Sequence, residues 1–111
     1  MRVVTADGGI LETLGALDDP TRLRVFCALR ERERCVRDLT ECERLGQSLV
    51  SHHLHRLMRA GLVRARRDRA YTLYSVDPAG LRSAAVALDS LLDPSTLVAE
   101  ARPGGNSGCC A

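Results

Sequence analysis

The sequence predicts a mainly α-helical fold with one small β-hairpin, in which four helices precede two strands and a fifth helix follows them. Apolar residues recur at helical spacing through the first half, strand-forming residues appear after Gly61, and helical spacing returns after Pro78. A chain of 111 residues is one domain by size, and dimerisation would stabilise so small a core. We expect this domain at residues 10–93, between a flexible leader at 1–9 and a flexible tail at 94–111 that carries a cysteine pair.

The first two helices follow from apolar spacing and from one N-terminal cap. Leu11, Leu14 and Leu17 lie on one side of a helix expected over residues 10–17. Asp19 and Pro20 mark the start of the second helix, because aspartate caps free backbone N–H groups and proline suits the first helical turn. The expected apolar face of this helix consists of Leu23, Phe26, Cys27 and Leu29. That position favours Cys27 as a small buried hydrophobe.

The next two helices are short and closely joined. We expect them at residues 36–44 and 48–60, with a turn at 44–47 between them and Gly61 as the C-terminal breaker. Two helices joined this tightly predict a helix-turn-helix.

A hairpin and a last helix complete the prediction. Residues 62–76 have the composition of two strands, with a charged tip at 66–69. The whole is therefore expected to be a winged helix-turn-helix. The last helix should begin at Pro78, and its apolar stripe consists of Leu81, Ala84, Leu88, Leu91 and Leu92.

The distribution of charge points to nucleic acid more clearly than the net charge of +2 does. Between His52 and Arg69 there are six arginines and one acid, whereas between Asp77 and Glu100 there are four acids and one arginine. No apolar run reaches the roughly 18 residues of a membrane span. The first residues lack a signal-peptide core, so we expect a cytoplasmic protein with free, chemically active cysteines.

The fourth helix and the hairpin carry the expected DNA contacts. A recognition helix presents polar side chains to base edges, and a basic wing follows the phosphate backbone or the minor groove. We expect contacts from Gln47, Ser48, Ser51, His52, His55, Arg56, Arg66, Arg67 and Arg69. The adjacent histidines 52, 53 and 55 are not spaced as metal ligands, so a core or phosphate-contact role is expected for them.

The segments LDDPTRLRVFCAL, ERCVRDL and GQSLVSHHLHRLMRAGLV resemble the ArsR/SmtB family of winged-helix metalloregulators over residues 10–92. The resemblance implies repression of a resistance operon that an inducer relieves. It also implies a homodimer formed by the first and last helices, here through Leu11, Leu14, Leu81, Leu88, Leu91 and Leu92. The chain departs from the family before the recognition helix, where Glu43 replaces a usual leucine and Arg44 a usual glycine. The turn is therefore expected to differ in shape.

The segment ERCVRDL is similar to the ELCVCDL metal box of arsenite and cadmium/lead sensors. Only Cys35 carries over, because Arg37 occupies the position of the second cysteine. We expect the remaining thiolates from Cys109 and Cys110 in the tail or from Cys42. Trivalent arsenic and antimony favour three sulfurs, and adjacent tail cysteines can turn toward one ion. As(III) is the expected inducer, with Sb(III), Cd(II) and Pb(II) as alternatives.

Two other readings of the thiols stay open. Oxidation could join Cys109 to Cys110, or Cys27 to a tail thiol, and make the protein a redox switch. Some persulfide-sensing relatives place a reactive cysteine at position 27, but they pair it with one on the final helix, which has none here.

Residues 78–111 contain no histidine, which disfavours the family's zinc, nickel or cobalt site. An enzyme is not expected, because no cysteine has a histidine–carboxylate couple beside it.

Overall fold

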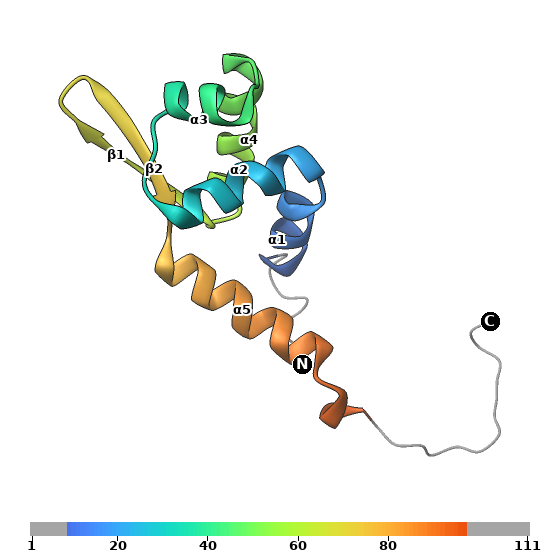
Figure 1. The fold of residues 1–111 in the computed structure, drawn as a ribbon. Coiled ribbons are helices and arrows are strands. Elements are labelled where there is room, and N and C mark those ends of the chain that lie inside the picture. The colour runs from blue at the N-terminus through green and yellow to red at the C-terminus, as the bar shows by residue number, and fades with distance from the viewer. Residues whose placement is uncertain (1–8, 98–111) are drawn as a thin grey trace.

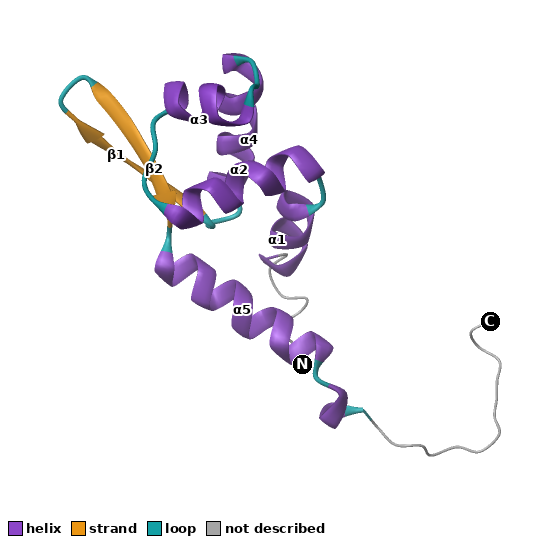
Figure 2. Cartoon of the chain, in the orientation of Figure 1, coloured by secondary structure: helices purple, strands orange, loops and turns teal. Residues whose placement is uncertain are grey.

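The computed structural model describes residues 9–97 and confirms the predicted order of elements (Figures 1 and 2). Helices α1 to α4 precede a two-stranded antiparallel hairpin, and α5 leads away from the helical cluster. The bounds are α1 Gly9–Leu17, α2 Pro20–Glu31, α3 Val36–Glu43, α4 Gln47–Arg59, β1 Val63–Asp68, β2 Tyr71–Val76 and α5 Pro78–Leu92, followed by a short 3-10 helix at Pro94–Thr96. Within this part of the chain, no helix is both long and apolar enough to cross a membrane.

Side-chain caps place the starts of the helices. The Asp19 carboxylate accepts hydrogen bonds from the backbone N–H groups of Thr21 (2.9 Å) and Arg22 (3.0 Å), as expected for an N-cap. These bonds, led by the one from Arg22, hold the pKa of Asp19 below its ordinary value. Asp77 caps α5 in the same way. The local sequence therefore sets where α2 and α5 begin.

The turn between α3 and α4 takes a conformation that glycine usually provides. Arg44 has φ 57° and ψ 51°, in the left-handed region, and its N–H bonds to the Thr40 carbonyl. Although arginine replaces the usual glycine at this position, the C-terminal end of α3 therefore has the backbone that a glycine would adopt. Gly46 then caps α4 without any side-chain hydrogen bond.

The core lies between α2, α3, α4 and the base of the hairpin. Its largest fully buried side chains are Val25, Leu39, Val50, Leu54, Leu57 and Leu62. The buried face predicted for α2 is partly wrong. Leu23 and Cys27, which were expected to be buried, are exposed, whereas Arg22, Val25 and Ala28 are buried. Both stripes have helical spacing and share Phe26 and Leu29. The packing of α2 against α4 and β2 selects the stripe that holds Val25.

A third, very short extended segment joins the hairpin. Arg34 forms an isolated antiparallel bridge with Tyr74 of β2, in which Arg34 N–H donates to Tyr74 O (3.0 Å) and Tyr74 N–H donates to Arg34 O (2.8 Å). The segment that leads into α3 is thus bonded directly to the wing.

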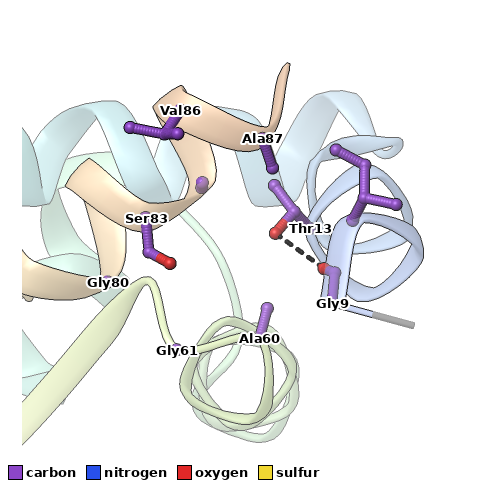
Figure 3. A pocket seen from close by; sticks show the side chains of 10 residues that line it. Gly9, Thr13, Ala60, Gly61, Gly80, Ser83, Val86 and Ala87 are labelled. Atoms are coloured by element: carbon purple, nitrogen blue, oxygen red, sulfur yellow. Dashed lines mark hydrogen bonds between the residues drawn. The ribbon is translucent and has the colours of Figure 1, made fainter. Parts of the chain in front are cut away.

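Helix α5 begins at a close backbone approach. A Cβ added at Gly80 would lie 1.7 Å from the carbonyl oxygen of Gly61, which ends α4 with φ 78° (Figure 3). No residue of α5 is buried in this protomer. The start of α5 therefore lies against the Gly61 backbone, and Leu81 and Ala84 pack against the core, while Leu91 and Leu92 near its end are exposed.

Candidate DNA interface and thiol sites

Helix α4 has the two faces expected of a recognition helix. Val50, Leu54 and Leu57 are buried as predicted. The exposed face holds Gln47, Ser48, Ser51, His52 and His55. Arg56 is half-buried, and its Nη2 lies beside Gly15 of α1, where an added Cβ would be 3.4 Å away. The polar face is thus free for DNA along its first turns, and Arg56 lies where α4 meets α1.

His53 belongs to the core. Its Nδ1 lies 3.2 Å from Nη1 of the buried Arg22, whose Nε donates to the Ala16 carbonyl (2.6 Å). The Nε2 atom of His53 is buried and has no hydrogen-bond partner among residues 9–97. Burial lowers the pKa of His53 below its ordinary value, against a weaker opposing effect of Asp19. His53 therefore links α4 to α2 and, through Arg22, to the end of α1.

The arginines of the wing do not share one environment. Arg66 donates to Glu33 through Nε (2.7 Å) and Nη2 (2.9 Å), and this fork lowers the pKa of Glu33 and raises that of Arg66. Arg67 points to the opposite face of the hairpin, and it forms no ion pair within the described part of the chain. Arg69 forms the tip turn with φ 61°.

Arg64 is a basic residue of the wing that was not among the expected DNA contacts. It is exposed and lies on the same face of β1 as Arg66, two positions before it. The period-2 spacing from Arg66 could have indicated it. Nothing in the sequence indicates Glu33 as the partner of Arg66, because the two are 33 positions apart.

Cys35 lies where α3 meets the wing. It is the N-terminal flanking residue of α3, is half-buried, and makes no side-chain hydrogen bond to the helix. A groove of about 380 Å³ beside it is lined by Cys35, Arg37, Asp38, Glu41, Tyr71 and Leu73. The carboxylates of this groove already have cationic partners: Asp38 pairs with Arg32 (3.4 Å) and Glu41 with Arg37 (3.5 Å). The free donor that the groove offers to a soft ion is therefore the sulfur.

Cys42 lies in a different groove. It is exposed, and it lines a cavity of about 500 Å³ with Cys27, between α2 and α3. Within residues 9–97, no three His, Cys, Asp or Glu side chains gather as a group that could hold a metal ion. Cys109 and Cys110 lie outside the described residues. The structure thus places Cys35 and Cys42 in separate grooves.

The residues expected at a dimer interface lie on α1 and α5. Leu11 and Leu92 are 69% and 71% exposed, and Leu14 and Leu91 are exposed as well. Leu88 is half-buried, and Leu81 packs against the core. Between α1 and α5 a cavity of about 480 Å³ is lined mainly by small residues (Figure 3). These two helices therefore carry an apolar surface that the protomer does not cover.

Comparison with known proteins gives one consistent family. The profile of the arsR family of bacterial regulatory proteins matches residues 19–65. The transcriptional repressor SmtB of Mycobacterium tuberculosis is 41% identical over 63 residues, which are 57% of this chain and 47% of that protein. The transcriptional regulator NmtR of Mycobacterium tuberculosis is 40% identical over 80 residues, or 69% of this chain and 67% of that protein.

Solved structures agree with the fold. A possible transcriptional regulator for arsenical resistance superimposes with a TM-score of 0.67 at 32% identity, covering 76% of this chain and 88% of that one. The chain spans about half the length of the first curated relatives it matches, 47% in the case of SmtB.

Proposed function

Because the chain belongs to the ArsR family of bacterial regulatory proteins, we propose that it is a transcriptional repressor of a metal(loid) resistance operon. It binds operator DNA as a homodimer in the cytoplasm and releases it when As(III) or Sb(III) binds cysteine thiolates. The observation that carries this proposal is the position of Cys35, at the start of α3 and next to the backbone bridge between Arg34 and Tyr74 of the wing.

DNA binding uses the exposed face of α4 and the wing. Gln47, Ser48, Ser51, His52 and His55 reach base edges in the major groove, since short polar side chains at the start of a recognition helix face them. Arg67 and Arg69 neutralise phosphates beside the wing. Arg56 on α4 and Arg66 on the hairpin contact the DNA backbone at the edges of this surface. Two such surfaces about one helical turn apart match an imperfect palindrome.

The inducer site includes Cys35, with Cys109 and Cys110 from the tail as the other thiolates and Cys42 as the alternative. The groove at Cys35 fits a thiophilic ion, because its carboxylates are paired with arginines and its sulfur is not. A ligand there touches α3 on one side and Tyr71 and Leu73 of β2 on the other. Binding that shifts either side changes how the wing sits relative to α4.

The required coupling is moderate. A difference of about 3 kcal/mol in inducer affinity between the two states changes DNA affinity roughly 150-fold, which suffices for induction. As(III) is favoured over Cd(II) and Pb(II) because a solved structure that resembles this chain is that of a possible transcriptional regulator for arsenical resistance. A redox switch on the same fold is the second candidate, because the described cysteines are all free thiols.

The test is a titration of a fluorescent duplex, taken from the DNA that flanks the chain's own gene, at fixed salt. Arsenite or antimonite should release the DNA, and Cys35→Ser should blunt the release without changing the affinity of the ion-free protein. Cys27→Ser is the matched control, since Cys27 lies outside this groove and should leave arsenite release unchanged.

Two results would overturn the metalloid assignment. If neither arsenite, antimonite, cadmium nor lead releases the DNA, the protein does not respond to these ions. If peroxide alone releases it and dithiothreitol restores binding, the thiols act as a redox switch, and intact mass would then show the loss of two hydrogens per disulfide.

A further inference from the structure

We propose that Cys27 and Cys42 form a second thiol site, separate from that of Cys35, which captures a monosubstituted trivalent arsenical, an arsenic centre with one organic group and two exchangeable oxygens. The inference goes beyond the proposed function, because it does not use Cys35, Cys109 or Cys110.

The two thiols come from different helices and line one cavity. Cys27 lies near the middle of α2 and Cys42 near the end of α3, 15 positions apart in the sequence, and both line the 500 Å³ groove between these helices. Both side chains are exposed, and the Cys27 sulfur has no hydrogen-bond partner among the described residues. The thiols are therefore accessible and not bonded to each other, with open space beside both.

The Cys42 sulfur lies between a cationic donor and a carboxylate at the wall of the groove. Its Sγ lies 3.6 Å from Nη1 of the buried Arg34 and 3.6 Å from Oε2 of Glu43. Arg34 is held in place by its bond from Nε to the Ala28 carbonyl (3.0 Å). A fixed guanidinium donor thus faces the sulfur that would bind arsenic.

The groove offers two ligand atoms rather than three. Glu31 and Glu43 also line it, but Glu31 pairs with Arg34 (3.0 Å) and Glu43 with Arg24 (3.1 Å). Inorganic arsenite prefers three sulfurs, whereas an arsenic that already carries one carbon has only two positions left for sulfur. The donor count therefore matches the monosubstituted arsenical.

The rest of the lining suits the organic group. Pro20, Leu23 and Ala28 contribute apolar surface beside the thiols. A cavity of about 500 Å³ is within the range of small-molecule pockets and far larger than a bare ion needs. A methyl or phenyl group on arsenic would lie against this apolar part of the groove.

The reaction needs no oxidant or reductant. R–As(OH)₂ and two thiols give R–As(S–Cys)₂ and two water molecules. Two As–O bonds break and two As–S bonds form, each thiol proton leaves with a hydroxide, and arsenic stays trivalent. The product cross-links α2 to α3, just before the turn at Arg44 that leads into α4.

The test uses the full chain with Cys35, Cys109 and Cys110 changed to serine, so that Cys27 and Cys42 are its two remaining thiols. Phenylarsine oxide is the probe. Native mass spectrometry should show one phenylarsenic group per chain, with both thiols lost to a thiol reagent and the adduct retained in excess glutathione. Adding Cys27→Ser or Cys42→Ser should abolish that retention, and both side chains are exposed, so these changes should leave the fold intact.

The folded groove should matter to the affinity. We expect the adduct to resist a competing dithiol about tenfold better in the folded chain than in urea, because the fold holds both thiols along one groove in advance. Equal retention in a single-cysteine variant, equal resistance in urea, or a phenylarsenic bridge between two chains would each overturn the proposal. Because this variant lacks the other three cysteines, loss of arsenite response in the native chain would not affect the result.

Discussion

At the scale of single residues, neighbouring arginines of the wing have different partners. Arg66 is held by both oxygens of Glu33, whereas Arg67 points to the other face of the hairpin and is free of ion pairs within residues 9–97. A guanidinium that already has a carboxylate partner neutralises a phosphate less effectively than an unpaired one. Arg66 and Arg67 should therefore contribute differently to DNA binding, although they are adjacent in the sequence.

Arg67→Ala should weaken binding to all DNA sequences and lower the slope of log K against log salt by about one, because one phosphate contact is lost. Arg66→Ala should change the slope less, since its charge is already compensated by Glu33. Fluorescence anisotropy at several salt concentrations measures both slopes. An equal loss of slope in the two variants would show that Arg66 leaves Glu33 when DNA binds.

His53 should make stability depend on pH. Burial holds its folded pKa below the ordinary value of about 6.5, so below pH 6.5 the unfolded chain binds more protons than the folded one. The free energy of unfolding should therefore fall as pH decreases from about 6.5 toward the folded pKa. Urea unfolding between pH 7.5 and 5.5 measures this.

The control for this pH effect is His53→Gln, which removes the titrating group. His52 and His55 are exposed and remain in the variant. The pH dependence over the same range should become flatter in the variant, whatever its absolute stability. An unchanged slope would mean that His53 is not the group responsible.

At the scale of elements, the start of α5 depends on the absence of a side chain at one position. A Cβ at Gly80 would collide with the Gly61 carbonyl oxygen, which is backbone and cannot move aside cheaply. Gly46, at the start of α4, has nothing within 4 Å of an added Cβ. The two glycines therefore make a matched pair for testing how α5 is seated.

Gly80→Ala should destabilise the protein by about 1–3 kcal/mol, as overpacking does, and should displace the start of α5. Gly46→Ala should cost about 1 kcal/mol, because alanine is a poorer N-cap than glycine but its Cβ meets no neighbouring atom. Urea denaturation of both variants gives the comparison. A Gly80→Ala variant as stable as the parent would mean that α5 is not held against Gly61.

The helix-turn-helix elements could be predicted in detail, because their signals are local. Asp19 and Pro20 mark the start of α2, Gly61 ends the helical segment of α4, and the buried residues Val50, Leu54 and Leu57 follow from helical spacing. The buried face of α2 could not be chosen in this way, since two overlapping stripes satisfy the same spacing. Its selection required the partners that pack against it.

At the scale of the whole molecule, the protomer leaves apolar surface on α1 and α5, and the second copy of the chain is the expected cover. Leu91→Glu should shift the protein to a monomer and sharply reduce operator affinity, because a dimer reads two half-sites at once. Leu23→Glu, at similar exposure on α2, is the control and should leave the dimer intact. Sedimentation velocity and anisotropy measure the two effects, and a dimeric Leu91→Glu would place the interface elsewhere.

The sequence by itself determined the order of helices and strands, the helix-turn-helix, the family and Cys35 as a thiol at the start of α3, because each depends on residues a few positions apart. Tertiary structure alone decided which stripe of α2 is buried, that Arg66 pairs with Glu33, that Arg34 bonds to Tyr74, and that Cys42 shares a groove with Cys27. Those contacts join residues between 15 and 40 positions apart. Only the packing of one element on another brings them together.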